Sequence, residues 1–482
     1  MKNKIDAFYT HYKIYDYHKG DCFQLERDLS TYDEIYHKYD NKYYIDEENH
    51  ILYVPRGYDP LLLQDYFKRG IGTPKNNVNV QKSIFTMRVS PRDDIQRESI
   101  RFLLGKDEFK RTLKASQLVF SLDPGVGKTY CCIAAISLMG CKSLIIVPND
   151  ELRNHWVDKF KTFTTLGAPN IVKLEGTTQL NKLLESSERK LVNKHVFITT
   201  HATISSYIKR EGKEALDELI NHLGIGVKVI DEAHLYFDST LNIDYFTNVP
   251  KTFYVTATFG RSDFKEDNIF QNSFKCIDKF IRHNEENYNH TVYLSVLFNS
   301  NPSHLDQIRI KGAKGFDANA YISYQLNNHK LKDYIIEIMD MFVKKDVQGK
   351  ILILSSQKQS CDTIRDLLID NYPHKKICSH HSGNKQTDLS EFDVICATSK
   401  MLGTGFDLPG MRAVINTEQA SSKINLPQIK GRLRKYAEGR DTYYVEITDK
   451  GFPNVARMYS VRQKIIKPLV KKVLILDKTI KR

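Results

Sequence analysis

Short runs of β-branched and aliphatic residues alternate with helix-like segments over most of the chain. A first series of these runs occupies residues 118–122, 143–147, 195–199, 227–230 and 252–256. Runs of this kind are typical of strands that are buried on both faces of a parallel sheet. Their alternation with helical stretches predicts βαβ units and therefore an α/β fold.

A second series of similar runs follows a polar break in the chain, the segment Asn284 to Asn289. The later runs occupy residues 292–298, 350–354, 394–397, 413–416 and 442–447. We therefore expect one parallel-sheet domain over residues 84–284 and another over residues 285–482.

The first part of the chain has a different pattern, in which many tyrosines are interleaved with Lys, Asp and His. Residues 43–55 have the pattern of two short strands around a polar turn, and residues 60–69 that of a helix with one apolar side. These features predict a small α+β module over residues 1–83. Its tyrosines and basic residues are suited to binding nucleic acid, and a small domain with an aromatic core is the alternative. The last stretch of the module, residues 76–83, is polar and is expected to be a linker.

The chain of 482 residues carries a surplus of positive charge. Lys and Arg total 71 against 58 Asp and Glu, a formal net charge of +13. This surplus favours a polyanionic partner, nucleic acid or an anionic membrane face, although a generally basic surface would give the same count. The longest apolar run, residues 131–141, is about eleven residues long and too short to span a bilayer. The N-terminus does not resemble a signal peptide, so we expect a soluble cytoplasmic protein, in the host cytoplasm if viral, with no membrane contact.

Eight cysteines are scattered along the chain without a CxxC pair. This spacing argues against a disulfide framework and against a zinc ribbon. The group formed by Cys378, His380 and His381 lacks a second pair of ligands at zinc spacing, so we interpret it as part of a loop.

The strongest local signal is the segment 121–129, which follows an expected strand and opens an apolar helix. A turn at this position directs backbone N–H groups inward, and the helix start adds positive potential. Its two loop glycines allow phosphate oxygens to approach the backbone. Lys128 can bridge the β- and γ-phosphates of a nucleotide, and the Thr129 hydroxyl can hold Mg²⁺. Leu122 replaces the first glycine of the usual GxxxxGK[ST] pattern, and a chance glycine-rich turn is the alternative.

A second signal lies further along the chain, in the segment Val229 to His234. Two apolar residues run directly into an acidic pair, as expected at the carboxyl end of a buried strand, where ligands of α/β proteins bind. Asp231 can hold Mg²⁺ through water, and Glu232 can polarise the attacking water in phosphoryl transfer. A charged loop is the alternative for the tetrapeptide alone, but its pairing with the phosphate loop favours catalysis.

Together the two motifs resemble those of the DEAH-type superfamily 2 helicases. Further motifs of this family occur in order in residues 91–96, 142–160, 198–203, 255–258, 352–356, 398–407 and 428–434. The resemblance covers roughly residues 90–450. It implies two RecA-like motor domains that bind ATP and Mg²⁺ and act on nucleic acid.

The resemblance implies nucleotide contacts in both motor domains. Gln96 would hydrogen-bond the adenine edge, although its spacing from Arg92 is one residue longer than usual and an exposed helix start is the alternative. The other implied contacts are Pro124, Gly125, Val126, Gly127, Lys128, Thr129, Gly405 and Asp407. Three residues would link hydrolysis to strand movement: His234, Thr256 and Thr258.

The last motif supplies the arginines that stabilise charge on the γ-phosphate in this family. Its pattern here is GRLRK instead of the usual GRxxR. Arg432 matches cleanly, the second arginine falls at Arg434, and Lys435 occupies the usual position of the arginine finger. Because lysine does not form the planar fork of arginine, the role is assigned to Arg432 and Arg434. A contact with a helix end is the alternative for one of them.

Small hydroxyl groups and backbone amides are expected to contact the nucleic-acid backbone without reading bases. The resemblance places these contacts at Pro148, Asn149, Thr200, Ser355, Thr398 and Thr404. Serine and threonine at strand ends are also common helix caps, which is the alternative for each hydroxyl.

Within the superfamily, the segment 50–58 of the N-terminal module resembles the bacteriophage UvsW-like helicases. This likeness implies a monomeric, ATP-dependent DNA helicase or translocase that acts on single-stranded, forked or branched DNA in replication, recombination or repair. Two alternatives remain open: an RNA helicase, because the same motor serves RNA, and a DNA-stimulated ATPase that acts in transcript release without strand separation. The ordered catalytic motifs argue against a purely structural nucleic-acid-binding protein.

Overall fold

The computed structural model of the protein describes most of the chain. The described residues are 4–33, 37–75, 78–106, 116–123, 125–261, 264–282, 290–312, 315–328, 330–344, 348–384, 386, 388–399, 410–418, 425–433 and 439–479. The chain divides into two compact units, Met1–His283 and Asn284–Arg482. Within the described ranges, no helix is both long and apolar enough to cross a membrane.

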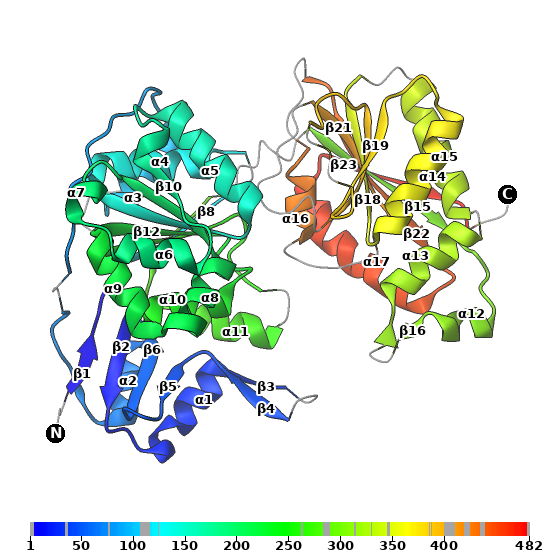
Figure 1. Ribbon diagram of the computed structural model, residues 1–482. Coiled ribbons are helices and arrows are strands. Elements are labelled where there is room, and N and C mark those ends of the chain that lie inside the picture. Colours follow the sequence, from blue (N-terminus) through cyan, green and yellow to red (C-terminus); the bar gives the residue numbers. More distant parts are fainter. Residues whose placement is uncertain are drawn as a thin grey trace. The chain divides into compact units, whose positions relative to one another are not determined.

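The first unit contains a sheet of seven parallel strands in the order β10-β11-β9-β12-β13-β8-β14. The strands are β8 (Gln117–Leu122), β9 (Lys142–Val147), β10 (Ile171–Lys173), β11 (Val196–Thr200), β12 (Ile225–Asp231), β13 (Lys251–Thr256) and β14 (Asp278–Arg282). The helices are α3 (Asp94–Leu103), α4 (Lys128–Met139), α5 (Asp150–Phe163), α6 (Thr177–Leu184), α7 (Glu188–Leu191), α8 (His201–Glu211), α9 (Lys213–Leu223), α10 (Phe237–Tyr245) and α11 (Phe264–Ser273). They cover both faces of the sheet (Figure 1).

Alternate residues of each central strand enter two separate cores. On β9, Leu144 and Ile146 belong to the cluster that includes α9 and α10, whereas Ile145 and Val147 belong to the cluster that includes α4 and α5. Because successive side chains of a strand point to opposite faces, a strand covered on both faces must be apolar throughout. This explains the continuous apolar runs of the sequence.

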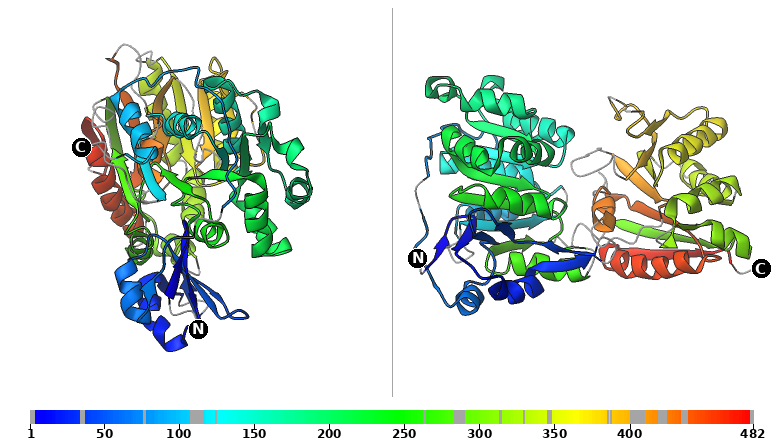
Figure 2. Two further views of the ribbon diagram at one scale, coloured as in Figure 1. Left: turned by 90° about the vertical axis from the view of Figure 1, so that its left-hand side faces the viewer. Right: turned by 60° about the horizontal axis from the view of Figure 1, so that its bottom comes forward.

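The N-terminal module has a sheet of its own, in the order β5-β6-β2-β1-β7. Its elements are β1 (Lys4–Ala7), β2 (His11–Tyr15), a 3₁₀ turn η1 (Lys19–Cys22), α1 (Phe23–Leu29), β5 (Tyr44–Asp46), β6 (Ile51–Pro55), α2 (Pro60–Phe67) and β7 (Gly70–Ile71). A separate hairpin is formed by β3 (Ser30–Asp33) and β4 (Lys38–Asn41), and it projects from the module (Figure 2). Asp59 caps α2 by accepting a hydrogen bond of 3.0 Å from the backbone N of Leu61.

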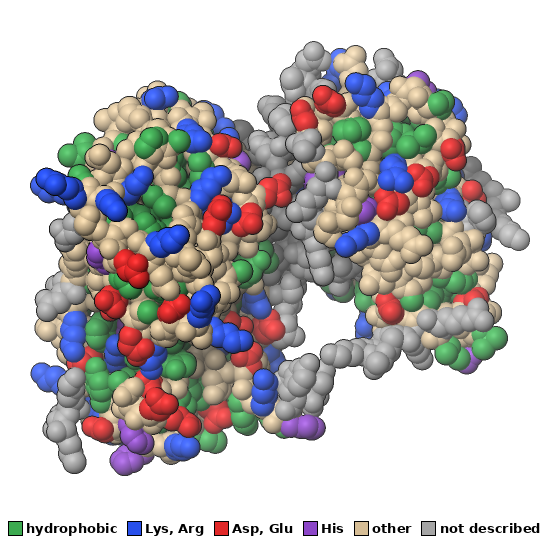
Figure 3. Space-filling model, viewed as in Figure 1, with side chains coloured by type: hydrophobic (Ala, Val, Ile, Leu, Met, Phe, Trp, Pro, Cys, Tyr) green, Lys and Arg blue, Asp and Glu red, His purple; other side chains and the backbone are tan. Residues whose placement is uncertain are grey.

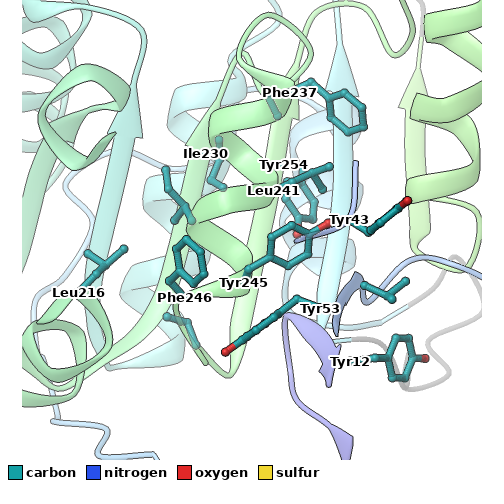
Figure 4. Close-up of a cluster of buried hydrophobic side chains, with 14 of the residues drawn as sticks. Tyr12, Tyr43, Tyr53, Leu216, Ile230, Phe237, Leu241, Tyr245, Phe246 and Tyr254 are labelled. Carbon is teal, nitrogen blue, oxygen red and sulfur yellow. The ribbon is translucent and has the colours of Figure 1, made fainter. Parts of the chain in front are cut away.

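The module and the first motor domain share one hydrophobic core. Tyr12 and Tyr53 of the module lie in the same buried cluster as Tyr245, the last residue of α10, and Phe246, which follows it (Figure 4). The rings of Tyr53 and Phe246 are 6.1 Å apart, and the hydroxyl of Tyr245 donates a hydrogen bond of 2.7 Å to the carbonyl of Lys42. The module is therefore packed into the first motor domain and is not an appendage.

The polar segment that was expected to be a linker is also attached to the motor domain where it is described. The backbone N of Gln81 donates to the carbonyl of Gly224 at 2.9 Å, and that of Ser83 donates to the carbonyl of Gly140 at 3.0 Å. These bonds satisfy main-chain groups that a polar sequence would otherwise leave to water.

The second unit repeats the parallel-sheet architecture, with strand order β19-β20-β18-β21-β22-β15-β23. The strands are β15 (Thr291–Phe298), β18 (Lys350–Ser355), β19 (Ile377–His380), β20 (Val394–Thr398), β21 (Met411–Asn416), β22 (Thr442–Asp449) and β23 (Lys472–Asp477), and a small hairpin is formed by β16 (Lys311–Gly312) and β17 (Gly315–Phe316). The helices are α12 (His304–Arg309), α13 (Ala318–Asn327), α14 (Lys330–Lys344), α15 (Lys358–Asn371), α16 (Asn425–Lys430) and α17 (Pro453–Ile466), followed by a 3₁₀ turn (Lys467–Leu469). The expected fold class, two parallel-sheet domains preceded by a small N-terminal module, is confirmed.

Candidate nucleotide-binding and coupling site

The phosphate loop joins β8 to α4 in the first unit. Gly125 and Gly127 have φ angles of 83° and 108°, in the left-handed region that glycine adopts at little cost. A Cβ atom on Gly127 would lie 2.5 Å from Nε2 of Gln96, so a larger residue here would displace the end of that side chain. The main chain of the loop is therefore open to close approach by a phosphate group. Pro124 lies outside the described residues.

Lys128 is the first residue of α4, and its side chain folds back over the loop. Its Nζ donates a hydrogen bond of 2.8 Å to the carbonyl of Leu122. Burial lowers the pKa of Lys128, and the carboxylates of Glu232, Asp231 and Asp123 oppose that shift. Lys128 bonds to the main-chain carbonyl of Leu122, which any residue at that position would provide. The replacement of the usual first glycine by Leu122 therefore does not remove this hydrogen bond.

The acidic pair lies where β12 ends. Oδ2 of Asp231 accepts a hydrogen bond of 2.8 Å from the indole Nε1 of Trp156, and Oδ1 accepts one of 3.1 Å from the backbone N of Glu232. Burial raises the pKa of Asp231, while the Trp156 hydrogen bond and the charge of Lys128 lower it. Glu232 has a φ of 51°, a conformation that costs a non-glycine residue about 1–3 kcal/mol and is typical of functional sites.

These groups fit a nucleotide that carries a divalent cation. Asp231 offers a buried carboxylate, the kind of ligand that Mg²⁺ prefers. Thr129 follows Lys128 in the first turn of α4, where a hydroxyl ligand is expected. The loop amides and the Lys128 ammonium group provide the positive surroundings that phosphates require.

Gln96 is buried against the phosphate loop. Its Nε2 donates to the carbonyl of Val126 at 3.0 Å, and its Oε1 accepts from the backbone N of Arg92 at 2.8 Å. The segment is also a helix start, because Asp93 caps α3 by accepting from the backbone N of Gln96 at 2.8 Å. The helix start that the sequence offered as the alternative is therefore present, and an adenine contact by Gln96 would require one of its present bonds to be exchanged.

The three residues expected to couple hydrolysis to movement lie together behind the acidic pair. Nδ1 of His234 is 2.7 Å from Oγ1 of Thr256 and 3.4 Å from Oε2 of Glu232. The hydroxyl of Thr256 donates to the carbonyl of Thr258 at 2.6 Å. Burial and the charges of Arg261 and Lys128 lower the pKa of His234 to about 3, so its ring is neutral at physiological pH.

The strand-contact candidates of the first unit lie at neighbouring strand ends. Asn149 caps α5 by accepting from the backbone N of Leu152 at 2.9 Å, and Thr200 caps α8 by accepting from that of Thr203 at 3.2 Å. Thr200 pairs in register with Val147, the residue before Pro148, so these candidates share one edge of the sheet. The capping role that the sequence suggested for the hydroxyls is present at Thr200, and Asn149 caps its helix in the same way.

The second unit brings Ser355 and Thr398 side by side. They are paired residues at the ends of β18 and β20, and both are buried. The hydroxyl of Ser355 has no hydrogen-bond partner among the described residues. Arg432 follows α16, and its backbone N donates to the carbonyl of Ile429 at 3.3 Å. Four further candidates lie outside the described residues: Thr404, Gly405, Asp407 and Arg434.

Sequence reasoning assigned no role to Trp156 or Arg261. Trp156 is fully buried and contacts Asp231, and Arg261 donates through Nη1 to the carbonyl of His234 at 2.5 Å. The signal for Trp156 was available, because a buried indole N–H nearly always requires an acceptor. Its partner could not be read from the chain, because Asp231 lies far away in sequence.

The interpretation of the cysteine and histidine group as a loop is wrong for two of its members, because Cys378 and His380 lie on the buried strand β19 and His381 follows it. His381 Nε2 lies 3.1 Å from Oδ2 of Asp362, and His380 Nδ1 accepts from the backbone N of Gln386 at 3.2 Å. Across the described residues, no group of three or more His, Cys, Asp or Glu side chains is arranged to hold a metal ion.

The fold and the site together define an ATP-binding motor with two RecA-like domains. The DEAD/DEAH box helicase family matches residues 93–266, and the helicase conserved C-terminal domain matches residues 330–436. The chain therefore belongs to the superfamily 2 helicases, and it is an ATP-dependent helicase or NTPase of that superfamily.

The chain is similar to several known proteins at low sequence identity. The chain is 19% identical over 419 residues to a transcript termination protein of Yaba monkey tumor virus, an alignment that covers 83% of this chain and 81% of that protein. Dbp5 of S. cerevisiae, solved with RNA and ADP BeF3, aligns with a TM-score of 0.53 at 16% identity, over 80% of this chain and 89% of that chain. UvsW of phage T4 aligns over 98% of this chain and 99% of that chain at 14% identity, with a TM-score of 0.37.

Proposed function

We propose that this protein is an ATP-dependent DNA helicase or translocase that remodels forked and branched DNA. The observation that carries the proposal is the continuous set of buried polar groups from Lys128 through Asp231 and Glu232 to His234 and Thr256. Such a set connects the place where phosphate binds to the end of a neighbouring strand of the same sheet. A motor needs this connection, because the energy of hydrolysis must move another part of the molecule.

Each side chain of the set has a distinct role in the proposed reaction. Lys128 and the loop amides hold and neutralise the phosphates, and Asp231 would hold Mg²⁺, which supplies charge neutralisation when bound. Glu232 positions the attacking water and accepts its proton. The neutral His234 ring contacts both Glu232 and the hydroxyl of Thr256, so a movement of Glu232 displaces Thr256 as well.

Binding to DNA is proposed to depend on the backbone and not on base sequence. The net charge is +13, but basic and acidic side chains are interspersed over the face seen in Figure 3. Among the side chains drawn in colour on that face, both signs occur on each unit, so net charge alone does not identify the DNA-binding surface. Short hydroxyl and amide contacts at the strand ends, near Pro148 and Thr200, suit a motor that must move along any sequence.

We place recognition of branched DNA on the β3–β4 hairpin. Most large tyrosines of the module serve the shared core, and Tyr12, Tyr53 and Tyr58 are each no more than 5% exposed. By contrast, Tyr32 and Tyr39 are 50% and 55% exposed, face each other across the hairpin and hold their rings 5.2 Å apart. Exposed aromatic rings stack on unpaired bases, which occur where a duplex branches.

The base of this hairpin is held by the motor domain. Lys42, which follows β4, forms an ion pair with Asp238 of α10, and its carbonyl accepts the hydroxyl of Tyr245 at 2.7 Å. An unpaired nucleobase stacked on the hairpin tyrosines would therefore be held at a constant distance from the first motor domain. That arrangement suits a recognition element better than a flexible tether would.

Transcript release without strand separation is the second candidate function. It is favoured by the viral relative, a transcript termination protein that aligns over 83% of this chain. The same coupling set would serve this activity, because displacement of a partner also requires translocation driven by ATP.

Rates of ATP hydrolysis and of strand separation should be compared on single-stranded DNA, duplex, forks, four-way junctions and RNA, with Lys128→Ala as the inactive control. Stimulation by forks and junctions together with strand separation supports the proposal. Stimulation by RNA alone would favour an RNA helicase, and stimulation by DNA without separation would favour transcript release. Absence of ATP hydrolysis on every substrate would overturn the DNA helicase, the RNA helicase and the transcript-release proposals alike.

A further inference from the structure

The one tryptophan of the chain joins two functional parts of the first motor domain. Trp156 lies on α5, the helix that begins directly after the expected strand contacts at Pro148 and Asn149. Its side chain is fully buried, and its indole Nε1 lies 2.8 Å from Oδ2 of Asp231. A single side chain thus connects the strand-binding helix to the carboxylate expected to hold Mg²⁺.

The geometry of α5 makes this link short and stiff. Asn149 caps the helix, and Trp156 lies about two turns, or roughly 10 Å, further along the axis. Long side chains on a helix lean towards its N-terminus, which here directs the indole to the sheet edge where β12 ends. The ring of Phe160, one turn later, lies 6.1 Å from the indole and packs against it. The indole therefore has little freedom to move independently of the helix.

The hydrogen bond also determines how the Asp231 carboxylate is oriented. One oxygen accepts from the main chain of Glu232, and the other accepts from Trp156. A main-chain carbonyl elsewhere would have satisfied the indole N–H equally well. The acceptor is instead the buried acidic group of the nucleotide site, so any displacement of α5 changes the orientation of that group.

We propose that Trp156 is a positioning residue that orients the Asp231 carboxylate and transmits strand binding at the start of α5 to the nucleotide site. This inference rests on the proposed function, because it requires nucleic acid to bind near Pro148. Strand binding shifts α5, the indole moves with it, and the carboxylate turns to the orientation that holds the cation during hydrolysis.

Intrinsic fluorescence tests the link directly, because Trp156 is the only tryptophan. The emission of the full-length protein is recorded with a non-hydrolysable ATP analogue, first in EDTA and then with Mg²⁺, and separately with a single-stranded oligonucleotide and no nucleotide. We expect one change that depends on Mg²⁺ and another that depends on the strand. Asp231→Asn should abolish the first change. An emission spectrum that responds to neither addition overturns the proposal.

A pair of variants separates positioning from packing. Trp156→Phe keeps an aromatic ring and removes the N–H, and Phe160→Leu disturbs the same helix face while leaving the hydrogen bond intact. Calorimetric titration of Mg²⁺ in the presence of the analogue should show about tenfold weaker binding in Trp156→Phe, the size expected for a lost hydrogen bond to a charged group. In Phe160→Leu the affinity should be unchanged, whatever its effect on the melting temperature.

The activity of the same variants tests the relay. Trp156→Phe should lose most of the stimulation of ATP hydrolysis by nucleic acid, and Phe160→Leu should retain it. Wild-type Mg²⁺ affinity and wild-type stimulation in Trp156→Phe would refute the inference while leaving the proposed function intact. Failure of nucleic acid to stimulate the wild-type protein would refute the proposed function, and the relay with it, whereas the Mg²⁺ titration would still decide whether Trp156 positions Asp231.

Discussion

Nδ1 of His234 lies 2.7 Å from the hydroxyl oxygen of Thr256, which joins the loop after the acidic pair to the end of β13. The hydroxyl proton of Thr256 is directed to the carbonyl of Thr258, so the imidazole supplies the proton between the two side chains. The neutral ring therefore carries its hydrogen on Nδ1. This side-chain contact adds to the main-chain pairing of Asp231 with Val255 and to the hydrogen bond of 3.2 Å from the backbone N of Ala233 to the carbonyl of Val255.

Removal of the bond between His234 and Thr256 should uncouple movement from hydrolysis. Thr256→Val keeps the shape of the side chain but lacks the hydroxyl, and we expect strand separation per ATP hydrolysed to fall by about tenfold while nucleotide affinity is retained. The ratio of unwound duplex to released phosphate measures this. Thr252→Val, on the same strand and equally buried, is the matched control and should leave the ratio unchanged. A normal ratio in Thr256→Val would remove the bond from the coupling path.

Substitution of Lys128 and substitution of Glu232 should have different effects on ATP binding and hydrolysis. Lys128→Ala should abolish ATP turnover, because the phosphates lose their fixed positive charge. Glu232→Gln should still bind ATP but hydrolyse it about 10²–10⁴ times more slowly, since it loses the general base and keeps Asp231. Equilibrium binding of a fluorescent nucleotide and single-turnover hydrolysis separate the two effects. Hydrolysis at the wild-type rate by Glu232→Gln would contradict its assignment.

The arginines of the last motif should affect the transition state more than binding. Arg432→Ala and Arg434→Ala should each lower the rate of hydrolysis by at least tenfold with little change in ATP affinity, because charge on the phosphoryl group develops during the reaction. If only one variant is slow, it identifies the arginine finger. Arg457→Ala, an exposed position on α17, is the control. Normal turnover in both motif variants would exclude the motif from the mechanism.

The N-terminal module offers two kinds of tyrosine with opposite expected behaviour. Tyr53→Ala should destabilise the first unit by about 3 kcal/mol, because it removes a buried ring from the shared core. The double variant Tyr32→Ala and Tyr39→Ala should keep the melting temperature and lose most of the preference for forked over single-stranded DNA. Phe23→Ala, also in the module and 73% exposed, should change neither property. Unchanged fork preference in the double variant would make the hairpin a structural feature only.

Point variants are required here because deletion of the module would expose the core it shares with α10. A chain that starts near residue 85 would lose the partners of Tyr245 and Phe246. We expect such a truncation to aggregate, so that loss of DNA binding in it would carry no information about recognition.

Acid should destabilise the first unit through a buried histidine. Burial lowers the pKa of His201 to about 4, below the value of about 6.5 in an unfolded chain. The neutral ring therefore contributes stability above pH 6.5, and that contribution is lost as the pH falls from about 6.5 to about 4, by about 3 kcal/mol in total. Denaturant unfolding across this range should show a shallower decline in His201→Gln. Equal slopes would mean that the ring is protonated in the folded state.

Most of the sheet architecture and the position of the nucleotide site could be predicted from local patterns. Residues 144–147 are apolar because both faces of β9 are covered. Burial of both faces requires consecutive apolar residues, which can be recognised in the sequence directly. The phosphate loop is similarly local, since its glycines, Lys128 and Thr129 are neighbours in the chain. The hydrogen bonds of Gln81 and Ser83 to the motor domain could not be predicted, because polar residues whose main chain is hydrogen-bonded have the same composition as a free loop.

The sequence by itself determined that two parallel-sheet domains exist and where most of their strands lie, because periodicity and short motifs record which groups must be buried or placed together within one turn. It did not predict β10, β14, β19 and β23. Only the tertiary structure decided that the module shares a core with the first motor domain and that the indole of Trp156 meets Asp231. Tyr53 and Phe246, like Trp156 and Asp231, are far apart in the chain. Their contacts depend on how separate elements pack, and packing leaves no periodic signal in either partner alone.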